Sequence, residues 1–260
     1  MFTPDHIREL WGYRSLIGKL AWSDFKLRYK NSVLGFFWTL LEPLLMLLVL
    51  YVVFSNLMRI QVEHYQLFLL LGIITWNFLD RGTSMGISGI IGKPSLVQKV
   101  YFPRDVLIIS ACLTAFMMTL LELAVFAVFM AVFRVTLTAA IIYFPLAFVL
   151  LFGMVLGLSL ALSALNVSFR DVQFIWRVIL QAGFFATPIL YPVTIFPPNL
   201  QWLVMLNPMA RIVSMLRDCT LYDTASGVGN VIYIIASTVM ILMAGYLIFD
   251  RLEPRFAEEI

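Results

Sequence analysis

The chain has 260 residues, of which 62% are hydrophobic and 13% are charged, and its mean hydropathy is +0.93. Ordinary soluble domains carry about a quarter charged residues, so this composition excludes an ordinary soluble domain and indicates an integral membrane protein. The net charge of +3 is too small to indicate nucleic acid as a partner.

The first informative stretch, residues 13–32, is basic and only partly apolar. Drawn as a helix, it places Lys19, Lys26 and Lys30 on one face, beside rows of aliphatic and aromatic side chains. This pattern is typical of an amphipathic helix that lies in the lipid headgroup layer. The positive flank of an ordinary membrane span has the same composition, and both interpretations place the lysines on the cytoplasmic side.

Six apolar runs follow, each long enough to cross a bilayer, for which a helix needs about 20 residues. They are expected at residues 33–58, 67–91, 106–133, 139–165, 173–191 and 230–249. A polar loop at 92–105 separates the second and third runs, and a tail at 250–260 follows the sixth. The segment 192–229 differs, because it contains several prolines and its apolar piece Trp202–Leu206 is too short to span. The sequence therefore predicts an all-α, polytopic membrane protein with a single transmembrane domain.

Six spans place both termini on the same side of the membrane. If that side is the cytoplasm, thirteen of the 18 lysines and arginines lie inside or at the inner boundary, and four lie outside. The positive-inside rule favours this orientation, since cytoplasmic flanks carry an excess of lysine and arginine. We therefore expect cytoplasmic N and C termini.

Apart from Arg177 at the inner boundary of the fifth run, the predicted spans contain four charged residues, namely Glu42, Asp80, Arg81 and Glu122. Each costs a few kcal/mol near the bilayer centre unless it is paired or hydrated. Asp80 and Arg81 are adjacent and do not share a helix face, so they need not pair with each other. A proton or ion pathway is one interpretation, and interhelical pairing that fixes the bundle is the other. Pairing is favoured, because carboxylates are few and the two histidines, His6 and His64, have no plausible partner in a span.

Small residues recur at four-residue steps in two of the spans. Gly82 and Gly86 form one such pair, and Gly153, Gly157 and Ala161 form another series. Both predict close packing between helices but nothing specific about function. No internal repeat is visible, which weakens an inverted-repeat carrier as an interpretation.

No hydrolytic or redox site emerges, and the two cysteines lack the spacing of a zinc site or a disulfide framework. The stretch Gly86–Ser95 is a near miss to a phosphate-binding loop. Five residues rather than four separate its first glycine from Gly92, and Pro94 follows Lys93. Proline has no amide donor for a phosphate cradle, so we expect no cofactor in this chain and any nucleotide on another chain.

Aromatic residues gather near the ends of the spans, and a few lie deeper. Most of them fit an interfacial belt. Deeper rings that face a channel could instead stack on the apolar faces of sugars.

Three features together resemble a known family. They are the segment GFFWTLLEP at 35–43, the loop VYFPR at 100–104, and the motifs TPILYP at 187–192 and LNP at 206–208 followed by Arg211 and Arg217. In this order they resemble the membrane subunits of ABC exporters for lipid-linked polysaccharides (O-antigen, capsule and teichoic acid), with the O-antigen exporter permeases as the nearest likeness.

The resemblance implies a homodimer in the bacterial inner membrane that works with two copies of a separate ATPase subunit, which would bind ATP and magnesium. It implies a coupling loop that docks on the ATPase, with candidate contacts Lys93, Lys99, Tyr101, Phe102, Pro103 and Arg104. The segment 192–229 would form short re-entrant gate helices, which membrane depth allows only where they are buried or line a wet cavity. A simple cytoplasmic connector and an ordinary external loop are the plainer alternatives for these two segments.

On this interpretation, cations of the basic stretch attract the pyrophosphate of a polyprenyl carrier. They are Arg14, Lys19, Lys26, Arg28 and Lys30. The first and fifth spans of two copies would then enclose the glycan channel. Its candidate lining and gate residues are Phe36, Trp38, Glu42, Trp76, Phe184, Phe185, Tyr191, Pro192, Asn207 and Pro208. A drug or small-solute ABC exporter and a proton-coupled secondary carrier are the rival functions.

Overall fold

The structure, a computed structural model, describes residues 4–256 apart from 31, 58–61, 100–101 and 137. Within this part of the chain the regular secondary structure is entirely helical, as the sequence predicts. The candidate coupling residue Tyr101 lies outside the described residues, as do the end of the predicted first run at residue 58 and the tail beyond residue 256.

Eleven α-helices are found in the described residues. They are α1 (Pro4–Gly12), α2 (Arg14–Tyr29), α3 (Phe37–Tyr51), α4 (Tyr65–Ser88), α5 (Pro94–Lys99), α6 (Asp105–Val132), α7 (Tyr143–Ser168), α8 (Val172–Ala186), α9 (Pro198–Val204), α10 (Pro208–Thr220) and α11 (Val228–Leu252). A π-helical turn, Val52–Leu57, extends α3, and a short 3-10 segment, Ala139–Ile142, precedes α7.

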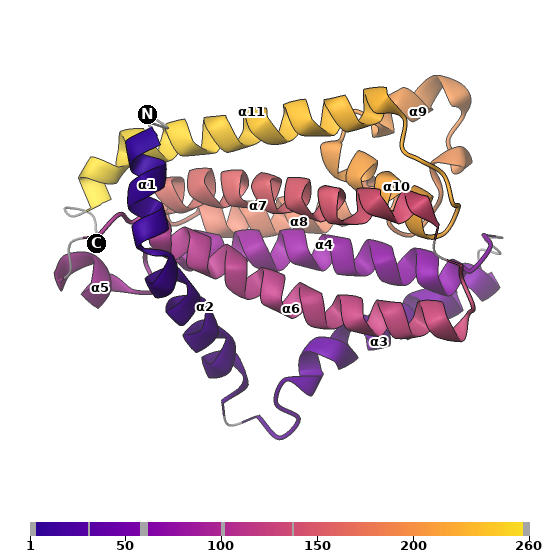
Figure 1. Ribbon diagram of the computed structural model, residues 1–260, viewed down its shortest axis with the longest axis horizontal. Coiled ribbons are helices and arrows are strands. Elements are labelled where there is room, and N and C mark those ends of the chain that lie inside the picture. The colour runs from indigo at the N-terminus through magenta and orange to yellow at the C-terminus, as the bar shows by residue number, and fades with distance from the viewer. Residues whose placement is uncertain (1–3, 31, 58–61, 100–101, 137, 257–260) are drawn as a thin grey trace.

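The long helices run lengthwise through the molecule (Figure 1). Helix α7 packs against α4 and α11, and α6 packs against α4 and α2. Both described ends of the chain and α5 lie at one end of the bundle, whereas α9 and α10 lie at the other (Figure 1). Helices α2 and α3 lie at an angle to the bundle and form a V, with residues 30 and 32–36 at its tip (Figure 1).

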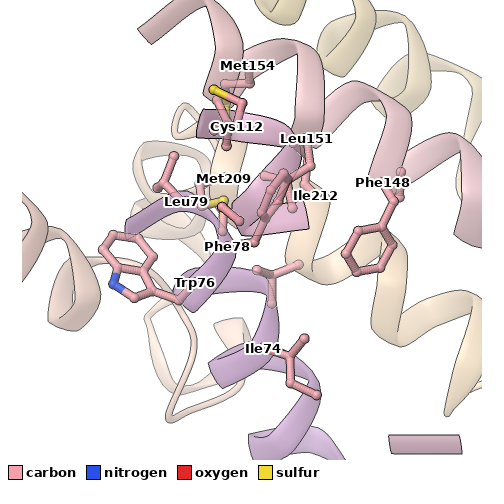
Figure 2. Close-up of a cluster of buried hydrophobic side chains, with 14 of the residues drawn as sticks. Ile74, Trp76, Phe78, Leu79, Cys112, Phe148, Leu151, Met154, Met209 and Ile212 are labelled. Atoms are coloured by element: carbon pink, nitrogen blue, oxygen red, sulfur yellow. The ribbon is translucent and has the colours of Figure 1, made fainter. Parts of the chain in front are cut away.

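Helix α4 is the centre of the core. Most of its residues are buried, including the apolar stretch Leu67–Ile74, as expected for a helix that is apolar on all sides. Its Phe78 belongs to the same cluster of buried apolar side chains as Leu151 of α7 and Ile212 of α10 (Figure 2). The bundle is therefore organised around the second predicted run.

Among the described residues, four helical segments are long and apolar enough to cross a membrane: Phe37–Ser55, Asp105–Val132, Ala139–Ser168 and Val228–Leu252. Helix α8 is apolar but shorter. The fifth predicted run, 173–191, is helical only as far as Ala186, because Thr187 precedes Pro188 and proline disfavours the helical conformation before it. The chain is a multi-spanning membrane protein.

Glycines set the closest helix approaches. A Cβ on Gly245 of α11 would lie 1.9 Å from the carbonyl oxygen of Gly157 on α7. A Cβ on Gly82 or Gly86 of α4 would lie 2.4 Å or 2.5 Å from side-chain atoms of α7. The predicted close packing at Gly82, Gly86 and Gly157 is confirmed, since only glycine lets these backbones approach so closely.

Candidate functional site

A pocket of about 750 Å³ opens between the two arms of the V and the bundle. We call it the V pocket. Its lining comes from α2, α3, α4, α6 and the V tip, and consists of Arg28, Tyr29, Ser32, Trp38, Thr39, Glu42, Leu45, Met46, Val49, Asn77, Arg81 and Met118. Polar side chains from α2 and α4 thus face a largely apolar stretch of α3.

Local chemistry sets the angle between α2 and α3. Gly35 has φ +53°, a conformation that glycine adopts without strain. Its backbone amide donates to Ser32 Oγ at 3.2 Å. The hydroxyl groups of Tyr29 and Thr39 share a hydrogen bond across the two arms. These contacts close the narrow end of the V and leave the pocket between its arms.

Arg81 is the charged centre of the pocket wall. Its Nη1 donates to Glu122 on α6, and its Nη2 donates to Glu42 on α3 at 3.0 Å. The Glu122 side chain is 0% exposed, whereas the Glu42 side chain is 64% exposed. Interhelical pairing of the intramembrane charges is therefore confirmed. Asp80 does not pair with Arg81 and instead accepts from Ser84 at 3.1 Å.

The opposite end of the bundle holds a second buried arginine. Arg217 on α10 donates to three backbone carbonyls: Pro188 at 2.5 Å, Ile189 at 2.8 Å and Phe68 at 3.1 Å. Its guanidinium also lies over the Phe68 ring, 3.3 Å from the centroid. The positive-inside count treats Arg217 as an external cation, but its side chain is almost fully buried. It fixes the turn after α8 against α4 and α10.

The remaining predicted gate residues surround this turn. Asn207 caps α10 by accepting from the Met209 amide at 2.9 Å, and its Nδ2 donates to Thr187 at 2.9 Å. Pro208 occupies the first turn of α10, where proline loses no helical hydrogen bond. Tyr191 donates through its hydroxyl to the Phe185 carbonyl at 2.6 Å.

Pro192 lines a second pocket at this end, of about 500 Å³, together with Arg217 and Tyr222. The structure therefore brings Tyr191, Pro192, Asn207 and Pro208 to one end of the bundle. None of them lies in the V pocket.

The described members of the predicted coupling set lie at the end of the bundle that holds both described ends of the chain (Figure 1). Lys93 pairs with Asp24 of α2 at 2.6 Å, so it holds the loop to the V. Arg104 donates to the Glu253 carbonyl at 2.6 Å and lies over the Phe256 ring. Phe102 is buried and Pro103 half-buried, whereas Lys99 is exposed on α5.

The contact between Arg104 and Glu253 joins the loop before α6 to the end of α11. Burial, and after it repulsion from Asp105, raise the pKa of the Glu253 carboxyl above its ordinary value. Two members of the predicted coupling set, Lys93 and Arg104, therefore have side-chain partners inside this chain, whereas Lys99 is exposed.

The prediction that His6 has no partner in a span is wrong. His6 Nε2 lies 2.8 Å from Asp105 Oδ2 at the start of α6, and its ring contacts the Tyr246 ring of α11. No sequence pattern links residues 6 and 105, which meet only because α1 folds back onto the bundle.

Four of the five predicted headgroup cations lie outside the V pocket. Arg14 donates to the Trp11 carbonyl at 3.1 Å, and Lys19, Lys26 and Lys30 are exposed along α2 and just after it. Lys26 lies over the Trp22 ring, 5.1 Å from its centroid. Arg28 alone lines the V pocket with Arg81.

The predicted channel aromatics are divided among different surroundings. Trp38 lines the V pocket, and Phe36 is exposed and stacks on Phe37 at the V tip. Trp76 is buried in α4 and meets Phe184 edge to face at 5.9 Å. Phe185 is 60% exposed on the outer face of α8. The described chain does not gather these rings into one pocket.

Nothing in the described residues resembles a metal centre, since no three His, Cys, Asp or Glu side chains come together there. The V pocket offers hydroxyl, amide and guanidinium donors beside an apolar wall. Such a surface suits binding of an amphipathic anion, and it holds no nucleophile paired with a base.

Comparison with known proteins gives the family of this chain. The family model described as ABC-2 type transporter matches residues 15–221. An O-antigen export system permease protein RfbA from Myxococcus xanthus is 32% identical over 98% of each chain. Another RfbA, from Klebsiella pneumoniae, is 30% identical over 90% of this chain and 91% of that protein.

A capsule polysaccharide export inner-membrane protein, CtrC from Neisseria meningitidis, is 24% identical over 92% of this chain and 91% of that protein. The match therefore extends from the V to α10 and covers both ends of the bundle. Membrane subunits of this kind carry no catalytic site of their own, so the chain is a transport subunit and not an enzyme. It belongs to the ABC-2 type transporter family, as a membrane permease related to the O-antigen and capsule polysaccharide export permeases.

Proposed function

We propose that this chain forms the transmembrane path of an exporter that moves a lipid-linked, O-antigen-like polysaccharide across the bacterial inner membrane. Two copies would enclose the channel, and two copies of a separate ATP-binding subunit would drive it. The V pocket is the observation that carries this proposal, because its polar donors and apolar wall match a lipid with a charged headgroup. The names of the relatives support the choice of substrate.

In this proposal the chain crosses the membrane six times, with α4 and α8 added to the four long apolar segments. The neighbours of helix α4 shield it from lipid, and this reduces the free-energy cost of placing Asp80 and Arg81 within the membrane. Helix α8 spans about 22 Å as a helix, and the turn fixed by Arg217 would complete the crossing. Both termini, and α5 with them, then face the cytoplasm (Figure 1).

The substrate would enter the V pocket from the inner leaflet, past the exposed cations of α2. Its glycan would leave through the end of the bundle that holds α9 and α10, which would act as a gate. Arg217 makes this end rigid enough to seal, since three carbonyls and a ring hold its guanidinium.

Contact with the ATPase would involve α5 and the loop after it. Lys99 is the clean test of this contact, because it is exposed. Arg104 is not, because its replacement would also release the end of α11. Lys99→Gln should leave ATP hydrolysis intact and reduce its coupling to export, whereas Arg251→Gln, at an exposed position near the end of α11, serves as a charge-matched control. Normal export by the Lys99→Gln complex would remove α5 from the coupling contact.

Reconstitution tests the proposal as a whole. The chain and its ATP-binding partner would be inserted into liposomes, and ATP hydrolysis measured with and without lipid-linked glycan. We expect the glycan to stimulate hydrolysis and to accumulate on the far side. Stimulation by small amphipathic drugs but not by the glycan would assign the chain to a drug or small-solute exporter instead.

A further inference from the structure

The two carboxylates that hold Arg81 differ in how easily they can be exchanged. Glu122 is 0% exposed and reaches Arg81 from inside the bundle. Glu42 is 64% exposed and approaches from the pocket side at 3.0 Å. A carboxylate beside an open pocket can rotate away from its partner, whereas a buried one cannot leave its partner without a large penalty. One of the two contacts is therefore permanent and the other is replaceable.

The surroundings of the replaceable contact are those of a phosphate site beside a lipid groove. Arg28 supplies a second cation to the pocket, and Asn77 and Ser32 add neutral donors. Leu45, Met46 and Val49 of α3 form its apolar wall. Guanidinium groups bind phosphate oxygens in pairs, and an apolar wall binds the adjoining hydrocarbon.

We propose that the phosphate headgroup of a prenyl-type lipid binds Arg81 in direct exchange for Glu42. This inference rests on the proposed export of a lipid-linked substrate and adds the residue that reads its headgroup. The exchange replaces one anion by another, so Arg81 stays neutralised and Glu122 stays paired. Glu42 thus occupies the site when no substrate is present.

The exchange also has a mechanical consequence. The bond between Glu42 and Arg81 joins α3 to α4 across the pocket. Once the headgroup replaces Glu42, this polar link is lost, and apolar contacts of buried residues such as Pro43 and Leu47 hold α3 at this level. Headgroup binding therefore loosens the first span at the moment when the pocket is filled.

The test measures headgroup affinity of the full chain in nanodiscs of zwitterionic lipid. Geranyl pyrophosphate is the probe, and the change in tryptophan fluorescence on binding is the readout, since Trp38 lines the pocket. Trp38→Phe should remove this change, which assigns the signal to the pocket. Glu42→Gln should bind the probe about fivefold more tightly. This factor corresponds to ~1 kcal/mol, the free energy of the ion pair between Glu42 and Arg81 that the probe no longer has to break. Arg81→Lys should bind it more weakly, because lysine lacks the planar fork.

Asp80→Asn is the matched control, because it also removes one negative charge, from the residue next to Arg81. The Asp80 carboxylate bonds Ser84 and not Arg81. The affinity of this variant should equal that of the wild type. Unchanged or weaker binding by Glu42→Gln overturns the exchange, and so does an equal gain in Asp80→Asn, which would reveal a general charge effect.

Two further probes separate the headgroup from the lipid. Inorganic pyrophosphate and geraniol should each bind more weakly than geranyl pyrophosphate, and equal binding of inorganic pyrophosphate would contradict a lipid ligand. Failure here is distinct from failure of the export function. If lipid-linked glycan still stimulates ATP hydrolysis while Glu42→Gln leaves probe affinity unchanged, export stands and the exchange is wrong.

Discussion

Two buried arginines show how differently this chain holds a buried cation. Arg217 is held by the Pro188 and Ile189 carbonyls in the turn after α8, and by the carbonyl and the ring of Phe68 on α4. Arg81 is held by two side chains, one of them exposed to a pocket. Backbone acceptors make a fixed joint, whereas a side-chain acceptor can be exchanged. The first arrangement suits a seal and the second suits a binding site.

Removal of the fixed joint should have the largest effect on stability. Arg217→Met leaves the Pro188 and Ile189 carbonyls without donors, at about 1 kcal/mol or more each. It also removes the contact with the Phe68 ring, worth about 1 to 2 kcal/mol, so we expect a loss of at least ~3 kcal/mol. The measurement is thermal unfolding of the purified chain in detergent. Arg251→Met, at an exposed position at the end of α11, should change stability by less than ~0.5 kcal/mol. Equal melting temperatures of the wild type and Arg217→Met would contradict the role of Arg217 in holding this end of the bundle.

The Arg81 cluster should respond strongly to one deletion and weakly to a paired one. Arg81→Gln leaves the buried Glu122 carboxylate alone, which costs about 3 kcal/mol. The double variant Arg81→Gln/Glu122→Gln removes both charges and should regain most of that loss. Thermal unfolding of the two variants gives the coupling. If the double variant is no more stable than Arg81→Gln, the instability of Arg81→Gln does not come from an unpaired Glu122 carboxylate.

A smaller loss of stability is expected when the N-cap of α10 is removed. Asn207→Ala removes the cap of α10 and the donor to Thr187, which should lower stability by about 1 kcal/mol. Asn230→Ala at the start of α11 is a suitable comparison, because that residue bonds Arg211 and Ser226 near the surface. A loss as large as that of Arg217→Met would show that the cap, not the arginine, organises this end.

The smallest effect should come from the exchangeable partner. Glu42→Gln weakens one contact of a largely exposed side chain, so the free energy of unfolding should fall by less than ~1 kcal/mol. The melting temperature should therefore change little. The same variant is expected to change headgroup affinity about fivefold. A stability loss as large as that of Arg81→Gln would make Glu42 a structural residue and would remove the contrast between the two arginines.

The long helices are the part of the fold that sequence reasoning predicts well. Apolar runs and small-residue spacing depend on local composition, and they place α6, α7 and α11 and the contact at Gly157. Helix α8 is the exception, because proline at position 188 ends it early.

The candidate site is less predictable for a physical reason. Glu42, Arg81 and Glu122 can be recognised singly as charges that need partners, but 39 and 41 residues separate the bonded pairs. Which carboxylate meets the arginine depends on the angle between α3 and the bundle, which no local pattern encodes. Arg217 is harder still, because its acceptors are backbone carbonyls that leave no trace in the choice of side chains.

Crosslinking in cells tests most directly whether substrate passes through the V pocket. A photoreactive benzoyl-phenylalanine would replace Met46, which lines the pocket, and in a second strain Val239, which is exposed on α11 away from it. We predict glycan-bearing adducts from position 46 and none from position 239. Adducts of equal yield at both positions, or none at position 46 in cells that export polymer, would contradict the account.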